Sequence, residues 1–300
     1  MKSSRRKFLK HVGMTTAGVA VLPHLNLRAA EKTVKSNQET WFKISLAQWS
    51  LHRTLYNGDL DNLDFPEFAA KNFDIHAVEY VNQFFKDKAK DTSYLKELNK
   101  RAADNGVTNV LIMVDGEGNL GDADESKRVQ AVENHYKWVD AAHFLGCKTI
   151  RVNAAGEGTP EEVGKRCIAS LSQLSDYAID AGINVVVENH GGISSHGDWL
   201  SNVLYSVGKL NCGSLPDFGN FYEYDRYKGV KELMLYAKGV SAKTNVFDDQ
   251  GNERTIDYSR MMDIVKAANY RGYVGIEFEG GEVSEVEGIK LSKKLLERSF

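Results

Sequence analysis

The chain has 300 residues, with 38 lysines and arginines against 41 aspartates and glutamates, and a formal net charge of −3 at pH 7. Residues 1–30 hold six of the basic residues and no acid, so the remainder of the chain carries a net charge of −9. Such a surface repels phosphate backbones, which argues against a nucleic-acid-binding protein. The three cysteines form no CxxC pair, which argues against a cysteine-based zinc site and a disulfide framework.

The N-terminus carries the pattern of an export signal. Twin arginines, Arg5 and Arg6, precede Phe8-Leu9-Lys10, and an apolar stretch with small residues follows over 12–25. This order resembles a twin-arginine signal, and it predicts a signal peptide over 1–30, a linker over 31–40 and a periplasmic location. The alternative is a frayed basic amphipathic tail. The apolar stretch is too short for a membrane span, and no later segment is apolar enough to form one.

From Trp41 onward the sequence alternates apolar runs with amphipathic stretches. The apolar runs predict eight strands, over 44–51, 77–81, 108–115, 147–154, 183–190, 213–218, 239–247 and 273–280. Helical spacing and capping signals predict helices over 91–105, 126–145, 161–181, 258–269 and 284–298. This alternation predicts an α/β fold, a single-domain (β/α)8 TIM barrel over 41–300. A doubly wound open sheet is the rival fold, and it is weakened because no GxGxxG motif follows the first run.

The run INVVVENHGG, residues 183–192, is the most informative stretch of the chain. Its β-branched residues predict a strand that is buried on both faces and that leads directly into Glu188 and His190. A carboxylate and an imidazole are costly to bury unless they are paired or bind something. Because barrel enzymes build their sites at the C-terminal ends of strands, this run predicts a functional position.

Each of the other predicted strands also ends in polar or aromatic residues, and in a barrel these share one rim. They are Gln48, Trp49 and His52; Glu79; Asp115; Arg151 and Asn153; Asp217; Ser241 and Lys243; and Glu277 with Glu279. A single acid at a strand end is more often a helix cap or an ion-pair partner. The prediction of a functional site therefore rests on the whole set of polar residues at the strand ends.

Three of these acids, Glu188, Asp217 and Glu277, fall on the fifth, sixth and eighth strands, on one side of the rim. Crowded carboxylates repel one another and resist ionisation. A divalent cation relieves this repulsion, and oxygen ligands suit Mg²⁺ or Mn²⁺. A basic side chain is the alternative, and Lys243 and Arg151 are both available.

The whole chain after the signal resembles the xylose isomerase-like barrel superfamily of sugar isomerases and epimerases. The resemblance is carried by VVVENHGG, LPDFGN, VSAKTNVFD and GIEFEG at the ends of strands five to eight. It implies one divalent metal, Mn²⁺ or Mg²⁺, held by Glu188, Asp217 and Glu277. The family's usual strand-seven histidine is Ser241 here, and Asn220 stands where many relatives have another histidine. His190 is the candidate for the missing nitrogen ligand.

The resemblance also implies a reaction in which carboxylates remove and return a proton on a carbon next to a carbonyl. Glu188, Glu277 and Lys243 are the expected catalytic residues. The residues expected to bind substrate are Arg151, His52, Glu79, Asn153 and Asn220. The aromatic residues Trp49, Phe218 and Phe221 could stack on a sugar, although packing in the core is the more probable role for such side chains.

The expected substrate is a small-molecule carbohydrate. No glycine-rich phosphate loop is present, so a free sugar, a keto-sugar or an oxidised glycoside is favoured over a sugar phosphate. Two alternatives remain open. One is a lyase that eliminates the substituent of a 3-keto-glycoside at the same site, and the other is a catalytically inactive periplasmic carbohydrate-binding barrel. The oligomeric state does not follow from the sequence.

Overall fold

The structure is a computed structural model that describes residues 40–300. The predicted signal peptide, 1–30, and all of the predicted linker except Thr40 lie outside these residues. Among the described helices, none is long and apolar enough to cross a membrane.

Strands and helices alternate along the described chain. The strands are β1 (Lys43–Ala47), β2 (Ala77–Val81), β3 (Thr108–Met113), β4 (Thr149–Val152), β5 (Asn184–Glu188), β6 (Cys212–Leu215), β7 (Val240–Thr244) and β8 (Tyr273–Phe278). The α-helices are α1 (His52–Tyr56), α2 (Phe65–Phe73), α3 (Thr92–Asp104), α4 (Glu125–Leu145), α5 (Pro160–Asp180), α6 (Gly197–Val207), α7 (Arg226–Leu233), α8 (Tyr258–Ala267) and α9 (Glu285–Glu297).

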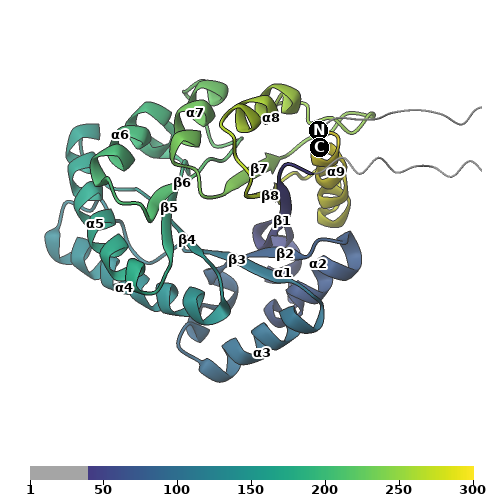
Figure 1. Ribbon diagram of the computed structural model, residues 1–300, viewed down its shortest axis with the longest axis horizontal. Helices are drawn as coiled ribbons and strands as arrows, with labels where there is room; N and C mark the ends of the chain where they lie inside the picture. The colour runs from purple at the N-terminus through teal and green to yellow at the C-terminus, as the bar shows by residue number, and fades with distance from the viewer. Residues whose placement is uncertain (1–39) are drawn as a thin grey trace, which may run out of the picture. The chain divides into compact units, whose positions relative to one another are not determined.

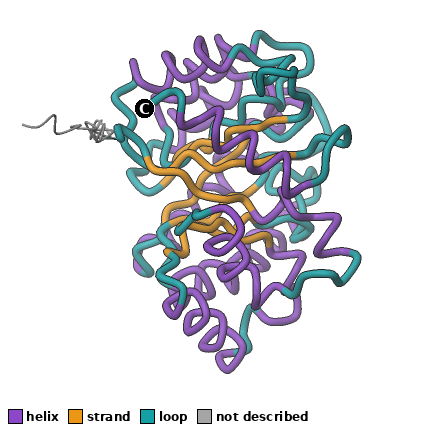
Figure 2. Tube along the Cα trace, turned by 90° about the vertical axis from the view of Figure 1, so that its right-hand side faces the viewer, coloured by secondary structure: helices purple, strands orange, loops and turns teal. Residues whose placement is uncertain are grey.

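The strands form one parallel sheet in the order β6-β5-β4-β3-β2-β1-β8-β7. Because β1 pairs with both β2 and β8, the sheet curls on itself, and the helices form an outer ring around it (Figure 1). In the side view the strands lie between layers of helix (Figure 2). The predicted (β/α)8 barrel is therefore confirmed, and the open-sheet alternative is not adopted.

The barrel closes between β6 and β7 by isolated bridges instead of a continuous ladder. Two parallel bridges, Ser214–Ala237 and Asp217–Ser241, join these strands. The Ser241 amide donates to the Pro216 carbonyl at 2.9 Å, and the Phe218 amide donates to the Ser241 carbonyl at 3.1 Å. This seam therefore passes through one of the three acids singled out above.

Strand residues alternate between two apolar regions. Val185 and Val187 of β5 belong to the large core between strands and helices, whereas Val186 belongs to a small cluster inside the barrel. Since side chains alternate along a strand, Glu188 also faces the interior. The same alternation turns Arg151, Lys243 and Glu277 inward, because their neighbours Ile150, Ala242 and Ile276 pack in the outer core.

The observed strands are shorter than most of the predicted runs. Residues 48–51 form a 3₁₀ turn in which the Gln48 side chain donates to Asn62 and accepts from the Val81 amide. Asn189 and His190 likewise lie beyond the end of β5. The side chains of Gln48 and Asn189 bind neighbouring loops at the points where the chain leaves the sheet.

We expect the loop after β8 to be intolerant of added volume at Gly280. A Cβ atom there would lie 1.8 Å from the Asn245 carbonyl oxygen, whereas a Cβ atom at Gly281 would have no neighbour within 4 Å. Gly280→Ala should lower the free energy of unfolding by about 1–3 kcal/mol, the usual cost of overpacking. Urea denaturation measures this, with Gly281→Ala as the matched control, and equal effects of the two variants would contradict the close approach.

Candidate active site

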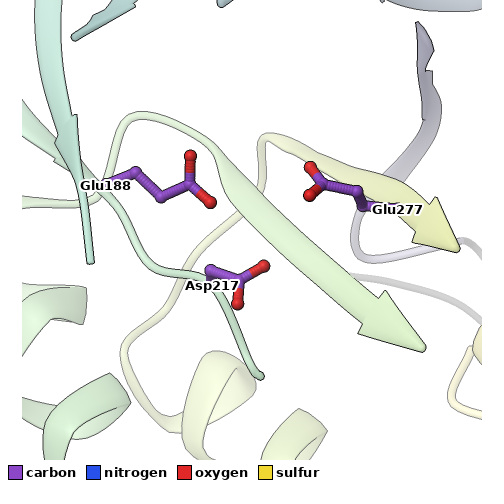
Figure 3. Close-up of side chains that lie close together, drawn as sticks. All are labelled: Glu188, Asp217 and Glu277. Carbon is purple, nitrogen blue, oxygen red and sulfur yellow. The ribbon is translucent and has the colours of Figure 1, made fainter. Parts of the chain in front are cut away.

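Three carboxyl groups converge at the C-terminal end of the barrel. Glu188 is the last residue of β5, Asp217 follows β6 by two residues, and Glu277 lies near the end of β8. One carboxylate oxygen from each lies within 4.8 Å of the other two, and all three side chains are buried. Glu188 and Glu277 point toward each other, with Asp217 beside the gap (Figure 3).

The position of Asp217 is fixed by the turn that follows β6. Its Oδ1 accepts hydrogen bonds from the amides of Gly219 at 2.8 Å and Asn220 at 2.7 Å. Its Oδ2 accepts from the Ser241 hydroxyl at 2.7 Å. The carboxylate is therefore held from both sides, and Ser241 contributes its hydroxyl to one of them.

Asn189 is a positioning residue that the sequence analysis did not single out. Its buried carboxamide accepts from the Asp217 amide at 2.8 Å and donates to the Asp217 carbonyl at 3.0 Å. This pair of bonds fixes the residue after β5 against the residue after β6. The sequence feature that could have identified Asn189 is its place between Glu188 and His190 at the end of the apolar run.

Two buried cations compensate the acids from opposite sides. The Arg151 Nε lies 2.8 Å from Glu188 Oε2, and its Nη1 lies 2.6 Å from Asp115 Oδ1. The Lys243 Nζ lies 2.5 Å from Glu277 Oε1 and 3.8 Å from Asp217 Oδ2. Lys243 also lies 3.1 Å from Glu279, which gives its ammonium a partner nearer the surface.

These surroundings separate the pKa values of the two facing glutamates. Burial raises the pKa of Glu188 well above its usual range, and the charges of Glu277 and Asp217 add to this, while Arg151 opposes it. Burial also acts on Glu277, but Lys243 outweighs it and holds the pKa of Glu277 below its ordinary value. Burial raises the pKa of Asp217 to about 6. The pKa values of the two facing glutamates are therefore shifted in opposite directions, which suits Glu277 to the role of a base and Glu188 to that of an acid.

Glu79 lies inside the barrel on β2, with 1% of its surface exposed. Its Oε1 accepts from the Ser45 hydroxyl at 2.6 Å, and its Oε2 has no hydrogen-bond partner among the described residues. Gly275 makes room for it, because a Cβ atom there would lie 2.6 Å from Oε1. Burial raises the pKa of Glu79 to about 7.

The remaining predicted site residues divide into two groups. Asn220 donates to Glu188 Oε1 at 3.3 Å, and Asn153 donates to Asp115 Oδ1 at 2.7 Å, so both belong to the network around the acids. His52 stacks on Trp49 and lies 3.6 Å from Glu285, outside that network. His190 has an exposed side chain and is not one of the residues whose ligand atoms converge, because it follows the strand end.

The three acids fit a hard divalent ion. Each supplies a carboxylate oxygen, and oxygen ligands suit Mg²⁺ or Mn²⁺. Glu188, Asp217 and Glu277 are the residues that would hold the ion. Asp217 Oδ2 accepts a hydrogen bond from Ser241, and Glu277 and Glu188 form ion pairs with Lys243 and Arg151, so an ion must compete with groups of the chain itself.

The protein is a closed (β/α)8 barrel, and its buried acids lie at the C-terminal ends of β5, β6 and β8. Barrel proteins of this class carry their functional site at that end. Residues 68–298 match the family model described as xylose isomerase-like TIM barrel, and the chain belongs to this family. A search of curated protein sequences finds no significant match.

Solved structures share the fold at low sequence identity. The IOLI protein with a bound zinc atom superposes with a TM-score of 0.69 at 15% identity, covering 86% of this chain and 98% of its own. The 3-keto-D-glucoside 4-epimerase YcjR from E. coli gives 0.63 at 15% identity, covering 85% and 99%. D-psicose 3-epimerase, solved in the presence of D-fructose, gives 0.67 at 14% identity, covering 86% and 98%.

The buried Glu79 should make stability depend on pH. In the folded protein Glu79 keeps its proton up to about pH 7, whereas an exposed glutamate loses its proton near pH 4.5. The protonated Glu79 therefore contributes its full stability to the fold below about pH 4.5, and this contribution is lost as the pH rises through 7. Glu79→Gln stays neutral at every pH. It should match the parent at pH 4.5 and exceed it at pH 8 by up to about 3 kcal/mol in urea denaturation. Glu282→Gln, at an exposed position, is the control, and a parallel pH dependence of Glu79→Gln and the parent would contradict the assignment.

Proposed function

We propose that the protein is a sugar isomerase or epimerase that transfers a proton on a carbon next to a carbonyl group. The observation that carries the proposal is the geometry of two buried glutamates that face each other, Glu188 and Glu277, whose pKa values are shifted in opposite directions. A base and an acid that face one reacting carbon are what such a transfer requires. The epimerase neighbours, including those named for 3-keto-D-glucoside and D-psicose, support this reaction class.

Each residue has a distinct part in the proposed step. The ionised Glu277 removes the proton from the carbon, and the electron pair moves onto the carbonyl oxygen to give an enediolate. The ammonium of Lys243 and the guanidinium of Arg151 lie beside the acids and stabilise this negative charge. Glu188, whose raised pKa suits it to act as an acid, returns a proton in its protonated form to carbon on the other side or to the neighbouring oxygen.

A divalent metal, Mn²⁺ or Mg²⁺, is part of the proposal as an additional holder of substrate oxygens. When bound, such an ion acts as a Lewis acid that polarises the carbonyl group. Glu188, Asp217 and Glu277 would hold it, and Asn220 would orient Glu188 through its amide.

The elimination of a substituent from a 3-keto-glycoside is the second candidate, because it begins with the same removal of a proton. The raised pKa of Glu188 favours it specifically, since a departing alkoxide needs a proton from an acid. Pure carbohydrate binding is less favoured, because binding does not require two facing acids whose pKa values are shifted in opposite directions.

Solvent exchange tests the two glutamates. We expect Glu188→Gln and Glu277→Gln each to lower deuterium incorporation from D₂O into a ketose or keto-glycoside substrate by at least about 100-fold, because each removes one proton-transfer group. NMR of a panel of free sugars, keto-sugars and sugar phosphates measures this, with the exposed Glu282→Gln as control. Undiminished exchange in either variant would remove that residue from the mechanism, and binding without exchange by the parent would favour the binding protein.

Metal affinity tests the role of Lys243. Lys243→Met removes the ammonium that competes for Glu277, so Mn²⁺ should bind about tenfold or more tightly, a gain of about 1.4 kcal/mol. Isothermal titration and the Mn²⁺-dependent rise in melting temperature measure this, with the exposed Lys294→Met as control. Ser241→His, which adds an imidazole next to Asp217, should act in the same direction. Failure of the parent and of both variants to bind Mn²⁺ would reject the metal site.

A further inference from the structure

We propose that a polar groove beside the three acids is a subsite for a second hydroxyl-bearing unit of the substrate, so that the enzyme acts on glycosides or disaccharides rather than on single sugars. This inference rests on the proposed function, because it assigns the substrate class of the same site. The groove lies between the β3–α4 loop, the first turns of α4 and the ends of β4 and β5.

The groove joins the acid cluster at two residues that line it, Asn153 and His190. Asn153 donates to Asp115 Oδ1, which also accepts from Arg151, and Arg151 pairs with Glu188. His190 follows Glu188 by two residues, and none of the hydrogen bonds among residues 40–300 involves its imidazole. A ligand in the groove therefore reaches the reacting centre through an amide and a free imidazole.

The groove is large enough for a group beyond the reacting sugar. Its volume is about 800 Å³, within the range of about 300–1,000 Å³ in which proteins bind drug-sized ligands. Glu188, Asp217 and Glu277 do not line it. A sugar ring that reacts between Glu188 and Glu277 would thus leave this space for the unit attached to it.

The lining has the chemistry of a carbohydrate site. It presents the carboxamides of Asn119, Gln130, Asn134 and Asn153 and the hydroxyl of Ser126, which both donate and accept hydrogen bonds as sugar hydroxyls do. Gln130 donates to Asn134 at 3.0 Å, which leaves the Gln130 carbonyl oxygen available to a ligand. The charged residues that line the groove are Glu117, Asp122 and Lys127, so it lacks the excess of positive charge that a phosphate site needs.

The walls of the groove are fixed by contacts between loops. The Gly121 amide donates to the Ala155 carbonyl at 2.8 Å, and Arg166 donates to the Gly121 carbonyl at 2.8 Å. The Glu117 carboxylate is turned into the protein, where Trp138 donates to it at 2.7 Å and Lys137 donates at 3.0 Å. The groove is therefore preformed, and its one buried carboxylate is neutralised away from the ligand.

The test compares a ketose with the same ketose carrying a glucosyl unit. The probes are D-fructose and three glucosyl-fructose disaccharides, turanose, maltulose and isomaltulose. At least one disaccharide should bind about fivefold or more tightly than D-fructose, and Gln130→Ala should weaken that disaccharide about fivefold without changing D-fructose, as loss of one hydrogen bond predicts. Gln173→Ala, an exposed glutamine of α5 outside the groove, is the matched control.

The outcomes separate this inference from the proposed function. If D-fructose exchanges deuterium but no disaccharide binds more tightly, or if Gln130→Ala affects both sugars equally, the groove is not a subsite and the proton-transfer function stands. If a disaccharide binds through Gln130 but no probe exchanges deuterium, the subsite stands and the proposed reaction does not. Failure of all four sugars to bind would overturn the subsite.

Discussion

An excess of buried negative charge at the mouth of the barrel governs how the site is built. Among the described residues, five carboxylates share two cations there: Arg151 contacts Asp115 and Glu188, and Lys243 contacts Asp217, Glu277 and Glu279. A buried charge without a partner costs several kcal/mol, so each acid must be paired, protonated or bound to a cation. The arrangement uses these solutions unequally. Lys243 bonds directly to Glu277 and holds its pKa below the ordinary value, whereas burial raises the pKa of Glu188 although Arg151 lies beside it.

The same groups also close the barrel. Because β6 and β7 share only isolated bridges, the hydrogen bond from the Ser241 hydroxyl to Asp217 supplements the strand pairing there, and the Asn189 carboxamide ties Asp217 to the end of β5. The site residues are thereby held by the backbone of three strands, and their geometry does not depend on a flexible loop. The consequence is that changes at Ser241 or Asn189 would act on folding and on the site together, whereas changes at Gln130 or Asn119 on the groove would leave the barrel intact.

The sequence was sufficient to predict the barrel and the convergence of the three acids. The apolar run Val185–Val187 predicts a strand buried on both faces. Together with the order of the strands, it predicts that Glu188, Asp217 and Glu277 lie on one rim of the barrel. No limits were predicted for the helices α6 and α7, whose packing depends on one glycine in each. Gly197 and Gly229 let these helices approach closely, since a Cβ atom on Gly197 would lie 2.6 Å from the Gly229 Cα atom. The need for glycine at these positions arises from contact between two helices. It leaves no periodic pattern in the sequence of either helix from which the helix could be predicted.

The burial of Glu79 inside the barrel could not be predicted from the sequence either. Its position at a strand end predicted a substrate-binding rim residue, yet it lies inside the barrel because Gly275, on β8, provides the space. The space depends on a residue nearly two hundred positions away, and only the closed barrel brings the two together. His190 differs for the opposite reason, since the chain leaves the sheet after Glu188 and carries the imidazole outward to the groove.

The serine on β7 connects these features. Its hydroxyl lies 2.7 Å from Asp217 Oδ2 and 3.3 Å from Glu277 Oε2, and because it carries one proton, the shorter contact is its main hydrogen bond. An imidazole at position 241 would add a nitrogen ligand for a metal ion, whereas the serine leaves the positive charge of the site to Lys243. Because the ammonium has a further partner in Glu279, nearer the surface, it can give up Glu277 to an arriving cation or substrate oxygen without losing all of its compensation. In the proposed enzyme, the charge balance of the site thus responds to what is bound, while the side-chain amides of the groove recognise the rest of the substrate.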